Sequence, residues 1–596
     1  MKSRRRFLAQ APLLAMAASA QAADPATAGA PPTWATAPGT GPEVSPQTFA
    51  EASKLMQVSL TPAELEQAAG SWRSMMPPLL ERRTGPHKLS LPDSVAPATL
   101  WQPLQFAPRL KANAKPERFQ RSADAHQALP ASDADIAFAP VTQLSRWIAA
   151  RKLTSERLTK IYLDRIHRFD PQLRCVITLN TEGALAAARA ADAEIARGHY
   201  RGPLHGIPYG VKDLLDTAGI ATTWGAEPYR KRVPAQDSAV VARLKAAGAV
   251  LVAKLSLGAL ALNDVWFGGQ TMNPWMPDVE GSSGSSAGPG AATAAALVGF
   301  SIGSETGGSI VSPSMRCGVA GLRPTFGRVA RTGAMTLAWT LDKLGPMTRS
   351  VEDAMLVLQA INGPDAGDPY SVPSSVGFDA SASVRGLKVG YVPGWMNEDP
   401  ATPVDRAALE HLTKLGLTPT PITLPDWPYG TLDTVIFAEA AASFEELTLS
   451  GDLAKLKMQV ADAWPNIFRQ SRFISAVDLV QADRLRRRVA VEMARIMNEV
   501  DLLLVPSLRG EMLTISNHTG HPSLTLRTGF VEVSEPRSDW APDPAKPAVP
   551  KFAAPRRVPH GVTLIGRLFD EGRLAQVGLA LERAAGVFAE RPPAFA

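Results

Sequence analysis

Three segments of the chain carry residues whose types and spacing suit an attack on a carbonyl group. The first, GIPYGVKD, brings Lys212 to the end of an apolar run. The second is GSSGSSAGPG, beginning at Gly281, and the third is GSETGGSI, in which Ser309 follows two glycines. A serine after paired glycines can approach converging backbone N–H groups, which bind an oxyanion. A lysine entering from a buried strand has a lowered pKa and is available as a neutral base.

The serine-rich segment does not fit the other roles of such a composition. No Gly-Lys-Ser/Thr follows its glycines, as a phosphate loop requires, and it stands between an NPWMP turn and an AATAAAL helix, where a linker is poorly placed. Residues 284–288 spell GxSxG, but a nucleophile elbow needs a buried strand directly before it, and NPWMPDVEGSS is polar. The histidines near Gly or Pro favour loop roles over a histidine triad; they are His205, His518, His521 and His560.

Together with CGVAGLRPTFGRVARTGAM, VDLLLVPS and GVTLIGRLFDEGRLAQVGLALE, the three segments resemble the amidase signature family over about residues 140–588. The resemblance implies a Ser-Ser-Lys triad with Ser309 as nucleophile and Lys212 as base. It implies Ser285 as the bridging serine, preceded by a cis peptide bond, because the family places this serine 24 residues before the nucleophile. Ser282, in the first copy of the tripeptide, is the alternative.

The resemblance further assigns the oxyanion donors to the backbone around Thr306, Gly307 and Gly308, and it implies neither metal nor cofactor. Asp213 and Arg316 either orient this centre or form structural ion pairs. Four apolar residues near the catalytic loops either line the substrate channel or belong to the core; they are Trp266, Phe267, Met272 and Trp275.

The implied function is hydrolysis of linear amides, at C–N bonds other than peptide bonds, through an acyl-enzyme on Ser309. The alternatives are the glutaminase (A-type) subunit of a glutamine-dependent amidotransferase, and an esterase or carbamate hydrolase on the same scaffold. Many members carry an arginine shortly after the nucleophile, whereas this chain has Ile310 and Val311. A cation for a carboxylate-bearing substrate is thus missing, which disfavours a role on glutamine.

The expected fold is α/β, a single large domain over residues 140–596 with a central mixed sheet covered by helices, because short β-branched runs alternate with helical stretches. Residues 48–139 are expected to form a helical extension and connector, in which Thr61, Pro62 and Glu64 give a capping box. Residues 23–47, rich in Ala, Pro, Thr and Gly, predict a disordered tether, and the proline-rich stretch 532–561 predicts an exposed loop.

Residues 1–22 have the pattern of an export signal, with a basic start, a short apolar run and an Ala20-Gln21-Ala22 cleavage site. The run from Ser3 to Leu8, SRRRFL, resembles a bacterial twin-arginine signal, with an ordinary secretory signal as the alternative. We therefore expect a periplasmic or secreted protein without an integral membrane segment in the mature chain.

The charge pattern gives no indication of a nucleic-acid partner. Of the formal charge of +6, four positive charges belong to the leader, and the run RLRRR from Arg484 lies in a helical pattern that predicts a solvated face. Cys175 and Cys317 stand in apolar contexts typical of a core. The expected partner is a small-molecule amide substrate, and a homodimer is possible.

Overall fold

The structure is a computed structural model, and it describes residues 29–31, 33–35, 38–77, 81, 86–89, 99, 118–542 and 549–596. The predicted export signal over residues 1–22 lies outside these residues. No helix in the described part of the chain has the length and apolar character needed to cross a membrane.

The described chain is built around an 11-stranded mixed sheet, which confirms the expected α/β class. Its strands β3, β4 and β7 are parallel to one another, and the neighbours of β9 and β14 are antiparallel to them. In spatial order the strands are β12 (Thr418–Pro421), β11 (Lys388–Tyr391), β13 (Leu502–Pro506), β15 (Arg556–Gly566), β14 (Ser523–Val533), β8 (Ala320–Arg323), β9 (Lys343–Thr348), β7 (Phe300–Glu305), β3 (Pro208–Lys212), β4 (Val250–Leu255) and β2 (Val176–Leu179). Two short pairs lie apart from it, β1 (Phe119–Gln120) with β10 (Phe378–Asp379), and β5 (Val265–Trp266) with β6 (Gly269–Gln270).

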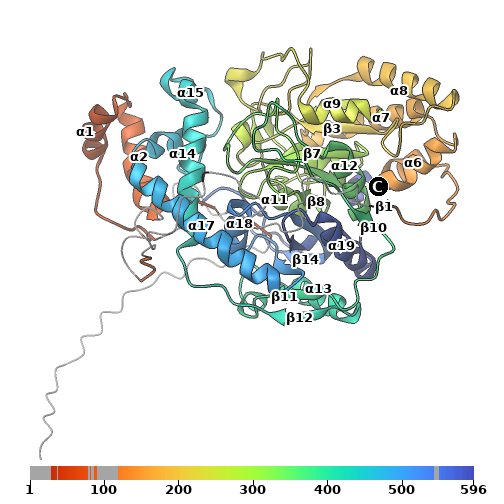
Figure 1. The fold of residues 1–596 in the computed structure, drawn as a ribbon. Helices are drawn as coiled ribbons and strands as arrows, with labels where there is room; N and C mark the ends of the chain where they lie inside the picture. The colour runs from red at the N-terminus through yellow and green to blue at the C-terminus, as the bar shows by residue number, and fades with distance from the viewer. Residues whose placement is uncertain are drawn as a thin grey trace, which may run out of the picture.

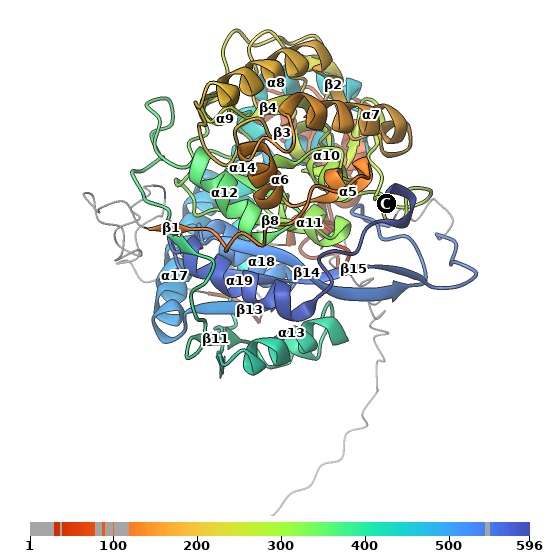
Figure 2. The same cartoon turned by 90° about the vertical axis from the view of Figure 1, so that its right-hand side faces the viewer.

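Helices surround the sheet (Figures 1 and 2). Every residue of β3, β7 and β9 is buried, as expected for strands covered on both faces. The helices are α1 (Pro46–Met56), α2 (Pro62–Met75), α5 (Asp133–Phe138), α6 (Val141–Ala149), α7 (Ser155–Leu173), α8 (Thr181–Ala196), α9 (Ala239–Ala246), α10 (Ala287–Ala294), α11 (Val311–Cys317), α12 (Val351–Ile361), α13 (Pro403–Lys414), α14 (Asp433–Ser443), α15 (Glu445–Leu449), α16 (Trp464–Ser471), α17 (Ala476–Glu499), α18 (Gly510–His518) and α19 (Glu571–Ala585).

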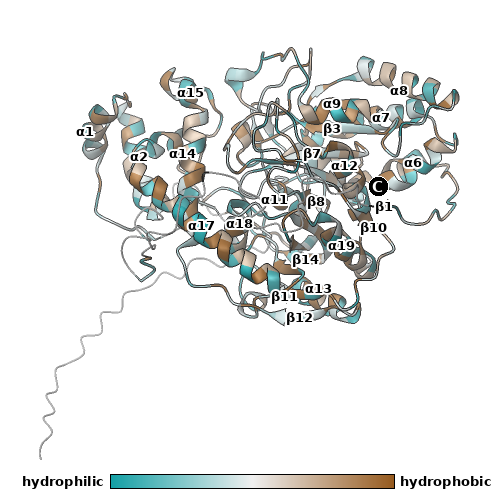
Figure 3. Ribbon diagram, viewed as in Figure 1, coloured by the Kyte–Doolittle hydropathy of each residue, from teal (hydrophilic) through white to brown (hydrophobic). Residues whose placement is uncertain are grey.

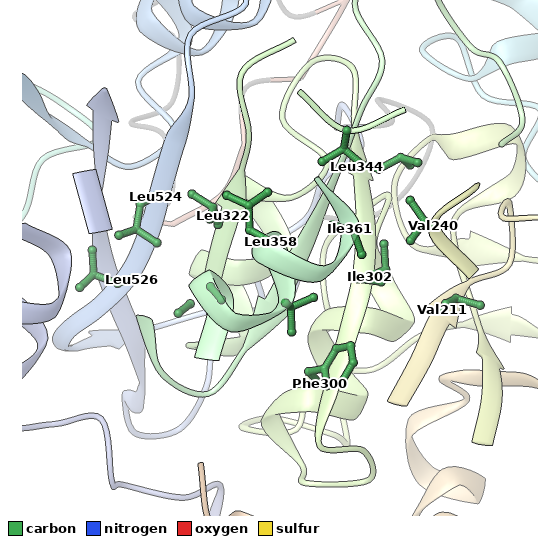
Figure 4. Close-up of a cluster of buried hydrophobic side chains, with 14 of the residues drawn as sticks. Val211, Val240, Phe300, Ile302, Leu322, Leu344, Leu358, Ile361, Leu524 and Leu526 are labelled. Carbon is green, nitrogen blue, oxygen red and sulfur yellow. The ribbon is translucent and has the colours of Figure 1, made fainter. Parts of the chain in front are cut away.

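The main core lies between the central strands and α12. Leu358 and Ile361 of α12 lie over side chains from β7, β8 and β9, such as Ile302, Leu322 and Leu344 (Figure 4). All five are almost completely excluded from solvent, at 0–2% exposure. Burial of apolar area on this scale fixes the ends of β3 and β7, where the candidate catalytic residues lie.

The N-terminal extension begins with two capped helices. Thr61 caps α2, Pro62 occupies its first turn, and Glu64 completes the capping box, as the sequence predicted. α2 then packs on α16, where Gln470 Nε2 donates to the carbonyl of Ala68 at 2.9 Å. Figure 1 shows α1 and α2 beside α14, on the side of the molecule away from α7 and α8.

Part of the predicted tether is packed against the domain. The ring of Trp34 meets that of Phe437 edge-on at 5.1 Å and lies 5.8 Å from that of Trp464. The carbonyl of Gly29 accepts a hydrogen bond from the buried Arg316 side chain at 3.3 Å. The prediction of disorder over 23–47 is therefore wrong for these residues. It rested on composition, and composition does not show that Trp34 has aromatic partners more than 400 residues away in the sequence. Its last residues, from Pro46, belong to α1.

The proline-rich stretch 532–561 is also less exposed than expected. Its ends extend β14 and β15, and Arg537 and Asp539 between them are buried at ion pairs with Glu280 and Arg316. These pairs join segments more than 200 residues apart, so the local composition could not indicate them.

The basic run on α17 is solvated only in part. Figure 3 shows hydrophilic and hydrophobic residues alternating along this helix, as its amphipathic pattern requires. Arg486 lies on its inner side, where it donates to the carbonyl of His518 at 2.6 Å and to that of Thr340 at 2.8 Å. Cys175 and Cys317 are buried free thiols, as the sequence indicated.

Candidate active site

Lys212 is the last residue of β3, and its side-chain nitrogen reaches a cluster of serine hydroxyls. Its Nζ lies 2.8 Å from the Oγ of Ser285, 2.8 Å from that of Ser304 and 3.2 Å from that of Ser286. Ser304 belongs to β7, the parallel neighbour of β3, so the pairing of two strands sets this contact.

The position of Lys212 determines its protonation. The side chain is fully buried, and burial lowers its pKa well below the ordinary value of a lysine, although the carboxylates of Asp342 and Glu305 act in the opposite direction. Desolvation dominates because the low-dielectric interior penalises the charged form. Burial therefore favours the neutral amine over the ammonium form.

Ser285 reaches Lys212 from the turn that leads into α10. The peptide bond between Gly284 and Ser285 is cis, as the resemblance implied. The amide of Ser286 donates to the carbonyl of Ser309 at 3.1 Å, which holds this turn beside the third catalytic segment. Ser282 lies elsewhere, with its hydroxyl on the carbonyl of Ser283 at 3.1 Å and its amide on that of Thr271. Of the two candidate bridging serines, the structure brings Ser285 to the lysine.

Ser309 lies in the turn between β7 and α11. The carboxylate of Glu305 holds the end of this turn. Glu305, the last residue of β7, accepts the amides of Ile310 and Val311 on one oxygen, at 2.8 and 2.9 Å. Its other oxygen accepts from Arg323 at 2.5 Å and from Asn517 at 2.9 Å. Burial alone would raise the pKa of Glu305, but the Arg323 charge and these hydrogen bonds outweigh it, so the pKa is lowered.

The three amides that precede Ile310 are available to bind a substrate oxygen. Those of Gly307, Gly308 and Ser309 donate to no group in the described part of the chain, and all three residues line a cavity. Gly308 has a φ of +132°, a conformation that L side chains rarely adopt, so glycine is needed there. The hydroxyl of Thr306 donates to Asp342 at 2.6 Å, which fixes the start of the turn.

The cavity has a volume of about 380 Å³, near the lower end of the roughly 300–1,000 Å³ usual for small-molecule sites. Its acidic wall residues are Asp433, Asp462, Glu511 and Asp539. Among the described residues that line it, none is a lysine or an arginine. Three aromatic side chains, those of Trp34, Tyr429 and Trp464, complete much of the apolar wall.

The family model described as Amidase matches residues 157–575. A protein of Mycobacterium tuberculosis named "Putative amidase AmiD" is 36% identical over 484 residues, covering 79% of this chain and 99% of its own. The A subunit of the glutamyl-tRNA(Gln) amidotransferase of Roseiflexus is 34% identical over 463 residues, covering 72% and 93%. The crystal structure of peptide amidase from Stenotrophomonas maltophilia superposes with a TM-score of 0.64 at 29% identity, covering 76% and 98%.

This chain belongs to the amidase signature family. It is an amidase, a hydrolase of amide C–N bonds, and the mixed sheet described above is the fold of this family.

Two charged residues beside the amidase centre are engaged in ion pairs. Asp213 accepts from Thr223 and lies 3.0 Å from the Nζ of Lys254, while Arg316 pairs with Asp539 at 2.9 Å. Neither contacts the three candidate catalytic residues in the described structure. Both fix loops around the amidase centre.

The remaining sequence candidates lie outside the catalytic contacts. None of the four histidines hydrogen-bonds Ser285 or Ser309 among the described residues; His518, which lines the cavity, has its pKa lowered to about 3 by burial and its Nδ1 at the carbonyl of Thr514. No group of three or more possible metal ligands occurs in the part of the chain that is described. The apolar candidates, which pack away from the amidase cavity, are Trp266, Phe267, Met272 and Trp275.

Sequence reasoning missed three polar residues of the amidase centre. Ser286 and Ser304 are joined by two hydrogen bonds, from the Ser304 amide to Ser286 Oγ and from that hydroxyl to the Ser304 carbonyl, each 3.1 Å. Glu305 follows Ser304 directly. A polar Ser-Glu pair at the end of an otherwise apolar strand was the available signal.

We expect Glu305→Gln to destabilise the amidase by about 3–5 kcal/mol, because it leaves the buried Arg323 guanidinium without its charge partner. Chemical denaturation measures this change in unfolding free energy. Glu499→Gln is the matched control, since its pair with Arg495 is about half exposed and should contribute under about 1 kcal/mol. Equal small losses in both variants would show that Glu305 does not anchor the turn.

Proposed function

We propose that this amidase is an exported enzyme that forms an acyl-enzyme on Ser309, with Ser285 and Lys212 relaying the proton. The observation that carries the proposal is the 2.8 Å contact between Lys212 Nζ and Ser285 Oγ in a fully buried site. A buried lysine without a carboxylate ion-pair partner is costly unless it is neutral, and a neutral amine is a proton acceptor.

The surrounding hydroxyls support a specific direction for the proton. A neutral amine has two N–H donors and one lone pair. The hydroxyl of Ser286 points its own proton at the Ser304 carbonyl, so it accepts from Lys212, and the Ser304 hydroxyl is the second acceptor. The lone pair is then left for the Ser285 hydroxyl. Ser285 in turn can take the proton of the Ser309 hydroxyl. The two residues are kept near each other because the amide of Ser286, the next residue after Ser285, donates to the carbonyl of Ser309.

The reaction follows from this arrangement. Ser309 Oγ attacks the amide carbonyl carbon while its proton moves to Ser285 and the Ser285 proton moves to Lys212. The carbonyl electrons collect on the oxygen, which the free amides of the 307–309 turn stabilise; one such donor contributes about 2.7–4 kcal/mol. The C–N bond then breaks, and the leaving amine takes a proton back through Ser285. Water repeats the sequence on the acyl-enzyme and releases the acid.

The cavity supports an uncharged amide as substrate. Its lining has no lysine or arginine among the described residues, and the guanidinium groups behind Asp539 and Glu511 are already engaged with those carboxylates, which disfavours a carboxylate on the substrate. Ile310 and Val311 stand where many relatives have an arginine, which agrees with this charge pattern. The alternative role, as the glutaminase component of an amidotransferase, is supported by similarity to the A subunits of such enzymes, and the same machinery also suits esters and carbamates.

A fluorophosphonate probe should label the protein at Ser309, as mapped by peptide mass spectrometry, and Ser309→Ala should abolish labelling. Ser282→Ala is the matched control and should label normally, whereas Ser285→Ala should lose at least about 100-fold in kcat/KM on simple amides. Folded protein that takes no label would refute the proposal. Partner-dependent hydrolysis of glutamine alone would favour the amidotransferase role instead.

The activity should be lost as pH falls, because protonated Lys212 cannot accept the proton. Below the lysine pKa, kcat/KM should fall about tenfold per pH unit. The midpoint should lie well below the ordinary lysine value of about 10.4, since burial lowers the folded-state pKa. Lys212→Arg, which stays charged, should be inactive at every pH. Activity retained by that variant would mean that a fixed cation suffices and that no base acts at this position.

Export is supported by residues 1–22, which carry a basic start, an apolar run and a small-residue cleavage site. Protein recovered from the periplasm should begin at Ala23 by N-terminal sequencing. Replacing both Arg4 and Arg5 by lysine should retain the enzyme in the cytoplasm, whereas the same exchange at Arg6 alone should have less effect. Recovery of the chain from Met1 onward in the cytoplasm only would contradict export, and export of the double variant would indicate an ordinary secretory signal.

A further inference from the structure

The cavity at Ser309 has a wall that lies far outside the family match. Pro31, Thr33 and Trp34 line it together with Ser309, although the match covers only residues 157–575. They precede α1, so they reach the site from the N-terminal part of the chain, far in sequence from the catalytic segments.

Trp34 is held on two sides of its indole. Phe437 of α14 meets its ring edge-on at 5.1 Å, and Trp464 of α16 lies 5.8 Å away. Its side chain also hydrogen-bonds the carboxyl of Asp433, the first residue of α14 and another cavity residue. Aromatic pairs of this geometry add about 0.5–1.5 kcal/mol beyond their area, so the indole has a defined place.

A second attachment holds the segment at Gly29. The Nε of Arg316 donates to its carbonyl at 3.3 Å, and the same guanidinium pairs with Asp539 in the cavity wall. A Cβ on Gly29 would come within 2.5 Å of Met315 and 2.7 Å of Arg537, and the residue has a φ of +81°. The positive φ therefore favours glycine at this position, and α11, which carries Arg316, links the segment to the nucleophile turn.

We propose that Trp34 is a specificity-determining residue of this amidase: its indole closes one side of the cavity and restricts the enzyme to amides with a compact, uncharged group at that wall. The inference rests on the proposed function of Ser309. The indole of Trp34 is an aromatic surface whose N–H group is engaged with Asp433, so this side chain contributes bulk rather than a binding group.

The test compares kcat/KM over two series of amides, one with a growing acyl group on a constant amine and one with a growing amine on a constant acyl group. In one of the two series, Trp34→Ala should raise the ratio of kcat/KM for bulky substrates to kcat/KM for small ones by about tenfold or more. A hydrophobic pocket discriminates between substrates that differ by one methylene group by about 10–200-fold. Trp34→Phe should keep most of the selectivity. Gly29→Val, which detaches the segment without removing the indole, should shift the ratio in the same direction as Trp34→Ala.

Trp72→Ala is the matched control, because Trp72 lies in α2, also N-terminal to the amidase domain, and packs on Phe49 rather than in the cavity. It should leave the ratio unchanged. An unchanged ratio in Trp34→Ala, or a uniform loss on all substrates, would overturn the inference.

Labelling with small and bulky fluorophosphonates separates this inference from the proposed function. Bulky probes should label Trp34→Ala faster than the wild type, relative to small probes. An identical size profile in both proteins would refute only the role of Trp34. Absence of labelling by every probe would refute the nucleophile itself.

Discussion

The site depends on one buried carboxylate at the end of β7. Glu305 ties together a strand end, the first amides of α11, Arg323 of β8 and Asn517 of α18. Because one of its oxygens accepts the amides of both Ile310 and Val311, the chain turns just before them, and the preceding residues line the cavity. The carboxylate stays ionised there only because Arg323 and the N–H groups compensate its desolvation. The geometry at Ser309 thus depends on the charge of Glu305, the residue directly before the turn Thr306–Ser309.

A second constraint is the depth of Lys212. Burial lowers the pKa of this lysine, and the burial is provided by the position of β3, which lies between β4 and β7 inside a wide sheet. The desolvation that makes the amine neutral also leaves its N–H groups in need of partners. Ser286 and Ser304 supply them, so these two serines are the polar complement of the buried lysine rather than additional nucleophiles.

The sequence predicted the parts of the site that recur as local motifs. Lys212, Ser285 and Ser309 were proposed from short segments that resemble family motifs, and the α2 capping box from residues within one turn of each other. Interactions across long separations left no such signal. Trp34 meets Phe437 after about 400 residues of intervening chain, and Arg537 and Asp539 are buried by partners from another part of the sequence. Composition predicted disorder and exposure at these places, because it does not describe what a segment packs against.

The candidate catalytic groups come from short local motifs, whereas the residues that would decide selectivity come from segments distant in the sequence. The proposed proton relay is built from strand ends and turns that the family match includes, and Lys212 Nζ lies within hydrogen-bonding distance of the Ser285 and Ser304 hydroxyls. The cavity wall is assembled from α14, α16, the 532–561 stretch and the N-terminal segment, which meet only in the folded chain. Arg316 connects the two, since it lies on the helix after Ser309 and holds both Gly29 and Asp539. Changes in the N-terminal segment can therefore alter which amide enters while leaving the bond-breaking groups in place.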